Sequence, residues 1–77
     1  MHDHADPPLW ATRVRQRRIE LQMRQDDVAA LANVSTRFVH AVENGKPSLQ
    51  LEKLLSVLHV LGLQLQITGP NVVIEVT

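Results

Sequence analysis

Two short amphipathic segments, residues 25–32 and 36–44, are separated by only about three residues, and this spacing limits the possible folds more than any other feature. Asn33 tolerates the left-handed conformation that ends a helix, so we expect it to close the first segment. Ser35 is a plausible N-cap for the second. The pattern therefore predicts two helices joined by a tight turn, which is a helix-turn-helix unit. Their inward-facing residues are predicted to be Val28, Ala29, Ala32, Val39 and Val42, with part of Phe38.

A further helix is predicted on each side of this unit. The first spans about 8–22, and the residues that recur there at helical spacing are Trp10, Val14, Arg18 and Leu21. The last spans about 49–61, with Ser48 as its expected N-cap. One of its apolar faces carries Leu51, Leu54, Leu55, Leu58 and Leu61, and the other carries Leu49, Val57 and Val60. A helix that is apolar on two sides is normally covered on two sides, which predicts contacts beyond a single chain.

After Gly62 the apolar period changes from about 3.6 to 2, which is typical of strands. Segments 63–68 and 72–76 alternate around a Gly-Pro-Asn turn, so they predict either a β-hairpin or two separately paired strands. Because an isolated hairpin is marginally stable, we expect pairing with a second chain. The residues predicted to form this dimer interface are Val57, Val60, Leu63, Leu65, Ile67, Val72, Ile74 and Val76.

The chain of 77 residues is the size of one small domain and contains no cysteine, which excludes disulfides and thiolate zinc sites. Residues 1–7 are polar and aperiodic, and we expect a disordered tail there. The helix-turn-helix domain is expected over 8–62 and the dimerising β-segment over 63–77. No stretch approaches the roughly 20 apolar residues of a membrane span, and nothing resembles a signal peptide. We therefore expect a cytoplasmic protein with no membrane partner.

The formal net charge is zero, but residues 12–46 hold seven basic and four acidic side chains. A basic segment of this kind is a modest electrostatic signature of nucleic-acid binding. An enzyme is not expected, because the chain has no cysteine nucleophile, no glycine-rich phosphate loop and no His/Asp/Glu cluster with metal spacing. Neither a cofactor nor a metal is expected.

The stretch RRIELQMRQDDVAALANVSTRFVHAVENGKPSL, residues 17–49, resembles the Cro/repressor (Xre) helix-turn-helix family. The resemblance covers about residues 12–61, and its markers are Gln25, the pairs Val28-Ala29 and Val34-Ser35, and the run Glu43-Asn44-Gly45-Lys46. The stretch LEKLLSVLHVLGLQLQI, residues 51–67, is similar to HipB-type antitoxins, in which a strand after the last helix pairs across a dimer. Three residues depart from the family pattern: Gln22 and Asn33 stand where glycine is common, and Arg24 where serine or threonine is usual.

The resemblance implies a mainly α fold: a four-helix, lambda-repressor-like domain followed by one or two strands that form an intermolecular sheet. It also implies a structural ion pair between Arg18 and Glu43. Because an α-helix fits the major groove, we expect the outward face of the 36–44 helix to read bases. The expected base-reading residues are Thr36, Arg37, His40 and Ala41. The expected phosphate-binding residues are Arg24, Gln25, Asn44, Gly45 and Lys46.

The predicted function is a dimeric repressor that binds a palindromic double-stranded operator. The HipB resemblance implies an antitoxin that represses its own operon, with a HipA-like kinase toxin as its partner. We expect the protein to be cytoplasmic and associated with the nucleoid. Two alternatives stay open. One is a stand-alone phage- or plasmid-type repressor, and the other is a protein-interaction module that has lost DNA binding.

Overall fold

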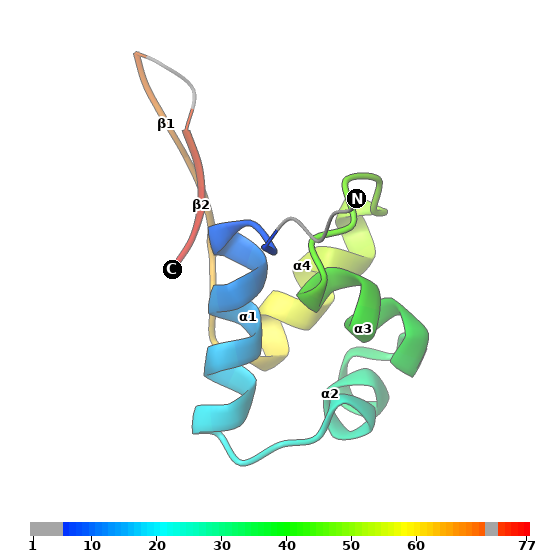
Figure 1. Cartoon of the computed structure of the whole chain (residues 1–77). Helices are drawn as coiled ribbons and strands as arrows, with labels where there is room; N and C mark the ends of the chain where they lie inside the picture. The colour runs from blue at the N-terminus through cyan, green and yellow to red at the C-terminus, as the bar shows by residue number, and fades with distance from the viewer. Residues whose placement is uncertain (1–5, 71–72) are drawn as a thin grey trace.

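The computed structural model describes residues 6–70 and 73–77, which form four helices followed by a two-stranded antiparallel sheet (Figure 1). The elements are α1 (Leu9–Glu20), α2 (Gln25–Ala32), α3 (Thr36–Glu43), α4 (Leu51–Val60), β1 (Leu65–Thr68) and β2 (Val73–Val76). The predicted fold class, mainly α with a small C-terminal β element, is confirmed. Residues 1–5 of the predicted N-terminal tail lie outside the described part.

The turn between α2 and α3 is the best predicted element. Asn33 adopts the left-handed conformation, with φ 58° and ψ 45°. The Ser35 hydroxyl caps α3 by accepting a hydrogen bond from the Phe38 backbone N–H at 3.0 Å. Both residues act through their own local chemistry, so neighbouring elements have little influence on them.

The ends of α1 and α4 differ from the prediction. Helix α1 stops at Glu20 rather than 22, and Gln22 takes a left-handed φ of 59° where glycine would be unstrained. Leu21 is consequently 39% exposed instead of facing the core. Ser48 is not the N-cap of α4: that position belongs to Gln50, which has no side-chain capping bond. Gln50 is extended and Leu49 packs against the core, and this packing outweighs the local capping preference of Ser48.

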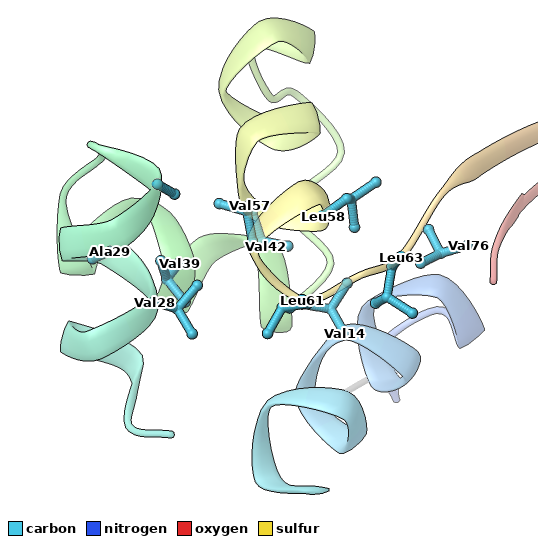
Figure 2. Packing of buried hydrophobic residues seen from close by; sticks show 11 residues of the cluster. Val14, Val28, Ala29, Val39, Val42, Val57, Leu58, Leu61, Leu63 and Val76 are labelled. Atoms are coloured by element: carbon cyan, nitrogen blue, oxygen red, sulfur yellow. The ribbon is translucent and has the colours of Figure 1, made fainter. Parts of the chain in front are cut away.

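Small aliphatic side chains from all four helices form the core (Figure 2). The largest side chains that are completely buried are Val14, Val28, Val39, Val42, Val57, Leu58 and Leu61. The inward faces predicted for α2 and α3 are confirmed. On α4, however, Leu51 and Leu55 are 57% and 44% exposed, so this side of the helix is not covered within the chain.

The two strands pair with each other as a hairpin, with Leu65 opposite Val76 and Thr68 opposite Val73. Beyond the strand ends, Gln64 and Thr77 exchange two backbone hydrogen bonds of 2.8 and 2.9 Å. Figure 1 shows the strands running past α1 and projecting beyond the helices. Of the two arrangements predicted for this segment, the structure contains the hairpin.

Several predicted dimer-interface residues are covered by their own chain instead. Val57 is completely buried, and Leu63 and Val76 are only 6% and 7% exposed within the same core (Figure 2). The period-2 pattern placed Leu63 and Val76 on one face correctly but did not show that α1 and α4 supply the cover. Val60 and Leu65 are half-buried, whereas Ile67 is 67% exposed. Val72 and the side chain of Ile74 lie outside the described part.

Within the described residues, none of the helices has both the length and the apolar character needed to cross a bilayer.

Candidate nucleic-acid interface

Helix α3 presents a polar outer face and an apolar inner face. Thr36, Arg37 and His40 are exposed, and Ala41 is half-buried beside them. The opposite side carries Val39 and Val42, both completely buried. The helix period of about 3.6 residues separates the two faces, so all four predicted base-reading residues share the outer one.

A buried ion pair fixes α3 to α1. Arg18 donates from Nε to Glu43 Oε2 at 2.6 Å and from Nη2 to Glu43 Oε1 at 3.0 Å, a bidentate arrangement. The guanidinium also donates to the Met23 carbonyl at 2.9 Å. The hydrogen bonds to Glu43 raise the pKa of Arg18, although desolvation acts in the opposite direction. The ion pair that the resemblance implied is therefore present, and it sets the position of α3 relative to α1.

Arg24 is the N-cap of α2, a position where its side chain cannot act as a serine or threonine hydroxyl would. Its backbone N–H donates to the Asp27 carboxylate at 2.8 Å, so the acidic residue in the first turn supplies the half of a capping box that binds the N-cap N–H. This hydrogen bond holds the pKa of Asp27 below its usual value. The Arg24 guanidinium lies 3.4 Å from Asp26 and 3.6 Å from Asp27. Exposed pairs of this kind are weak, so they bind the Arg24 guanidinium only loosely.

Two hollows flank α3. The first, of about 410 Å³, is lined by Pro7, Thr12, Arg15, Gln25, His40, Glu43 and Asn44. The second, of about 240 Å³, is lined by Ser35, Arg37, Phe38, Ala41, Lys46, Ser48, Leu49, Gln50 and Lys53. The first lies between α1, α2 and the C-terminal half of α3, and the second lies between α3 and the start of α4. Helix α3 thus has a hollow on either side. The first hollow contains one arginine, Arg15, and the second contains Arg37, Lys46 and Lys53.

The phosphate-binding groups predicted around Gly45 are only partly available. The Gly45 backbone N–H donates to the Val42 carbonyl at 3.0 Å, and the Lys46 backbone N–H donates to Ala41 at 3.1 Å. The backbone clamp expected there is therefore wrong, because these donors close the end of α3. Gly45 has a φ of 72°, and a Cβ at this position would collide with the Pro8 ring. Its role is structural, whereas the Lys46 side chain remains exposed.

Two further predicted side chains have internal partners. Gln25 Nε2 donates to Glu43 Oε1 at 3.2 Å, so this amide supports the Arg18–Glu43 pair as well as lining the first hollow. Asn44 Nδ2 donates to the His40 carbonyl at 2.8 Å, and the side chain remains exposed in the same hollow.

Two basic residues beside α3 were not among the predicted contacts, namely Arg15 and Lys53. Arg15 precedes Arg18 by three residues and therefore lies on the same side of α1. Helical spacing in the sequence could have predicted this position. Lys53 had no such signal, because it becomes adjacent to Lys46 and Arg37 only through the loop before α4.

The described residues contain no group of three or more His, Cys, Asp or Glu side chains that could hold a metal ion. The chemistry that this surface offers is hydrogen-bond donation and positive charge around one protruding helix. Those are the groups with which proteins contact base edges and backbone phosphates.

Comparison with known proteins agrees with this geometry. Residues 14–67 match the helix-turn-helix family profile (HTH_3), which spans α2, α3 and α4 completely. The chain is also 44% identical over 58 residues to y4mF of Sinorhizobium fredii (strain NBRC 101917 / NGR234), an uncharacterised HTH-type transcriptional regulator. That alignment covers 75% of this chain and 76% of the relative.

Proposed function

The chain belongs to the Cro/C1-type (Xre) helix-turn-helix family of DNA-binding transcriptional regulators, and we propose that it is a sequence-specific repressor whose α3 binds the bases of an operator. Members of this family are not enzymes. The observation that carries the proposal is the exposed polar face of α3 between two hollows that contain basic side chains. In a major-groove complex, α3 would meet base edges and the two flanks would meet phosphates of opposite strands.

Arg37 is proposed to supply most of the sequence discrimination, because a guanidinium can donate bidentately to guanine O6 and N7. Its side chain is exposed on α3 and lines the second hollow. We expect Arg37→Ala to weaken binding to an operator selected from a random duplex library by about 1–3 kcal/mol. Binding to unselected duplex should change little. Fluorescence anisotropy with both duplexes tests this, and equal weakening on the two would make Arg37 a phosphate contact instead.

Lys46 is proposed to bind a backbone phosphate, since it is exposed and lines the second hollow together with Lys53. Lys46→Ala should weaken binding to every duplex to a similar extent. The plot of log affinity against log salt concentration should lose about one unit of slope, which corresponds to one phosphate contact. A titration series in KCl measures this slope, and an unchanged value would remove Lys46 from the interface.

We further propose that the repressor acts as a two-fold dimer on a palindromic operator. Support comes from the exposed Ile67 and the open edges of the hairpin, since unpaired edges favour strand addition. A two-fold axis would bring the recognition helices of the two chains about 34 Å apart, one turn of DNA. The expected operator therefore has two inverted half-sites with centres about 10 base pairs apart.

The antitoxin role is a finer proposal than the regulatory one. It is supported by the HipB-like stretch 51–67 and by the strand β1, which follows α4 after a short turn as that resemblance implied. The exposed leucines Leu31, Leu51 and Leu55 on α2 and α4 are candidate contacts for a HipA-like kinase toxin. A kinase reading frame adjacent to the gene, and co-purification of its product, would support this role. A stand-alone repressor would show neither.

A protein-interaction module without DNA affinity is the remaining alternative. Phosphate neutralisation makes duplex affinity fall steeply with salt, whereas such a module would show no salt-dependent duplex binding. A KCl titration of the wild-type chain on any duplex distinguishes the two.

A further inference from the structure

The three arginines that alternate along α1 have different surroundings in the structure. Arg17 donates from Nε to the Leu61 carbonyl at 3.0 Å and lies 3.5 Å from Glu20, so it ties α1 to the end of α4. Arg13 borders the hairpin, in a hollow that includes Glu75 and Thr77. Arg15 is exposed and lines the first hollow beside α3. Of these three arginines, only Arg15 therefore lines a hollow beside the recognition helix.

The composition of the first hollow favours an anion at this position. Glu43 contributes to its wall, but both carboxylate oxygens of Glu43 accept hydrogen bonds from Arg18. Among the described residues that line the hollow, Arg15 alone carries a fixed positive charge, and it forms no ion pair with another described residue. Thr12, one turn earlier on α1, adds a hydroxyl donor to the same wall.

The position of this hollow beside α3 indicates which anion could bind there, namely a phosphate of the DNA backbone. His40 of α3 and Asn44, the C-cap of the helix, are exposed in this hollow. Lys46 and Lys53 border the opposite hollow. If α3 enters the major groove, the two sugar-phosphate backbones that border the groove lie on its two sides. One backbone would then run along the Lys46 side and the other along the Arg15 side.

We propose that Arg15, with the Thr12 hydroxyl, binds a DNA backbone phosphate on the side of α3 opposite Lys46, which makes α1 a direct contributor to the interface. This inference rests on the proposed DNA-binding function. A guanidinium presents donors that match phosphate oxygens, and such a contact positions the protein without reading sequence.

The test uses the full chain and a mixed-sequence duplex of about 20 base pairs in a KCl titration. Arg15→Gln should lower the salt slope by about one unit and weaken binding to any duplex. Arg13→Gln is the matched control, since it removes the same charge from the same helix on the hairpin side, and its slope should equal that of the wild type. Arg15→Lys should keep most of the slope because it retains a cation. Thermal melting of each variant by circular dichroism verifies folding, which Arg15 as an exposed residue should not alter.

Equal loss of slope in the Arg13 and Arg15 variants would overturn the proposal in favour of a general charge effect. An unchanged slope in Arg15→Gln would overturn it too. Both outcomes differ from failure of the proposed function, because in that case the wild-type chain itself would show no salt-dependent duplex binding.

Discussion

Glu43→Ala is expected to lower the free energy of unfolding by about 3 kcal/mol, at the lower end of the roughly 3–5 kcal/mol for a broken buried ion pair. The Glu43 side chain is 3% exposed and that of Arg18 is 13% exposed. Removal of the carboxylate leaves a largely buried guanidinium whose remaining hydrogen-bond partner among the described residues is the Met23 carbonyl. The residual exposure of Arg18 allows some hydration, which limits the loss. Urea denaturation followed by circular dichroism measures the change.

The matched control for this prediction is Glu20→Ala, because Glu20 pairs with Arg17 at 3.5 Å and is 56% exposed. A surface pair contributes between 0 and about 1 kcal/mol, so this variant should remain close to the wild type. The double variant Arg18→Met/Glu43→Leu should recover most of the lost stability, since apolar residues of similar volume often replace buried pairs well. If Glu43→Ala unfolds at the same urea concentration as Glu20→Ala, the pair does not support the fold.

Local signals explain why the central part of the fold could be predicted. Asn33 and Ser35 act within their own turn, and the inward faces of α2 and α3 follow from spacing alone. Ser48 shows the limit of this reasoning. Its capping preference is as clear as that of Ser35, but the N-cap of α4 is Gln50, two residues later, and Leu49 between them packs against the core.

Assignments that depend on what lies opposite a residue could not be made from the sequence. Alternation grouped Leu63 with Val76, but only the packing of the hairpin shows that their own chain covers them. Helical spacing places Arg13 and Arg15 on different sides of α1, but only the structure shows that Arg15 borders α3 and that Arg13 borders the hairpin. The Arg18–Glu43 pair was accessible only through the family resemblance combined with the inward position of both residues.

Deletion of residues 63–77 is expected to have the largest effect of any change to the chain. The deleted segment contains Leu63 and Val76, which are 6% and 7% exposed in the core, so truncation removes two buried side chains. Full burial of such a side chain contributes about 1.5–3 kcal/mol, and the cavity that remains adds to the loss. Against a total stability of about 5–15 kcal/mol, the truncated chain should be largely unfolded at 37 °C or melt well below the wild type. Thermal melting by circular dichroism measures this.

Ile67→Lys separates the contribution of the hairpin to assembly from its contribution to folding. Ile67 is 67% exposed on β1, so a lysine there leaves the core intact but opposes close approach of a second hairpin. If the hairpins join two chains, sedimentation equilibrium should show a dimer for the wild type and a folded monomer for Ile67→Lys. The monomer should bind the operator much more weakly, because it contacts a single half-site. Ile19→Lys, at a 49% exposed position on α1, is the control and should remain dimeric. A dimeric Ile67→Lys variant with unchanged operator affinity would show that the hairpin stabilises its own chain without joining two chains.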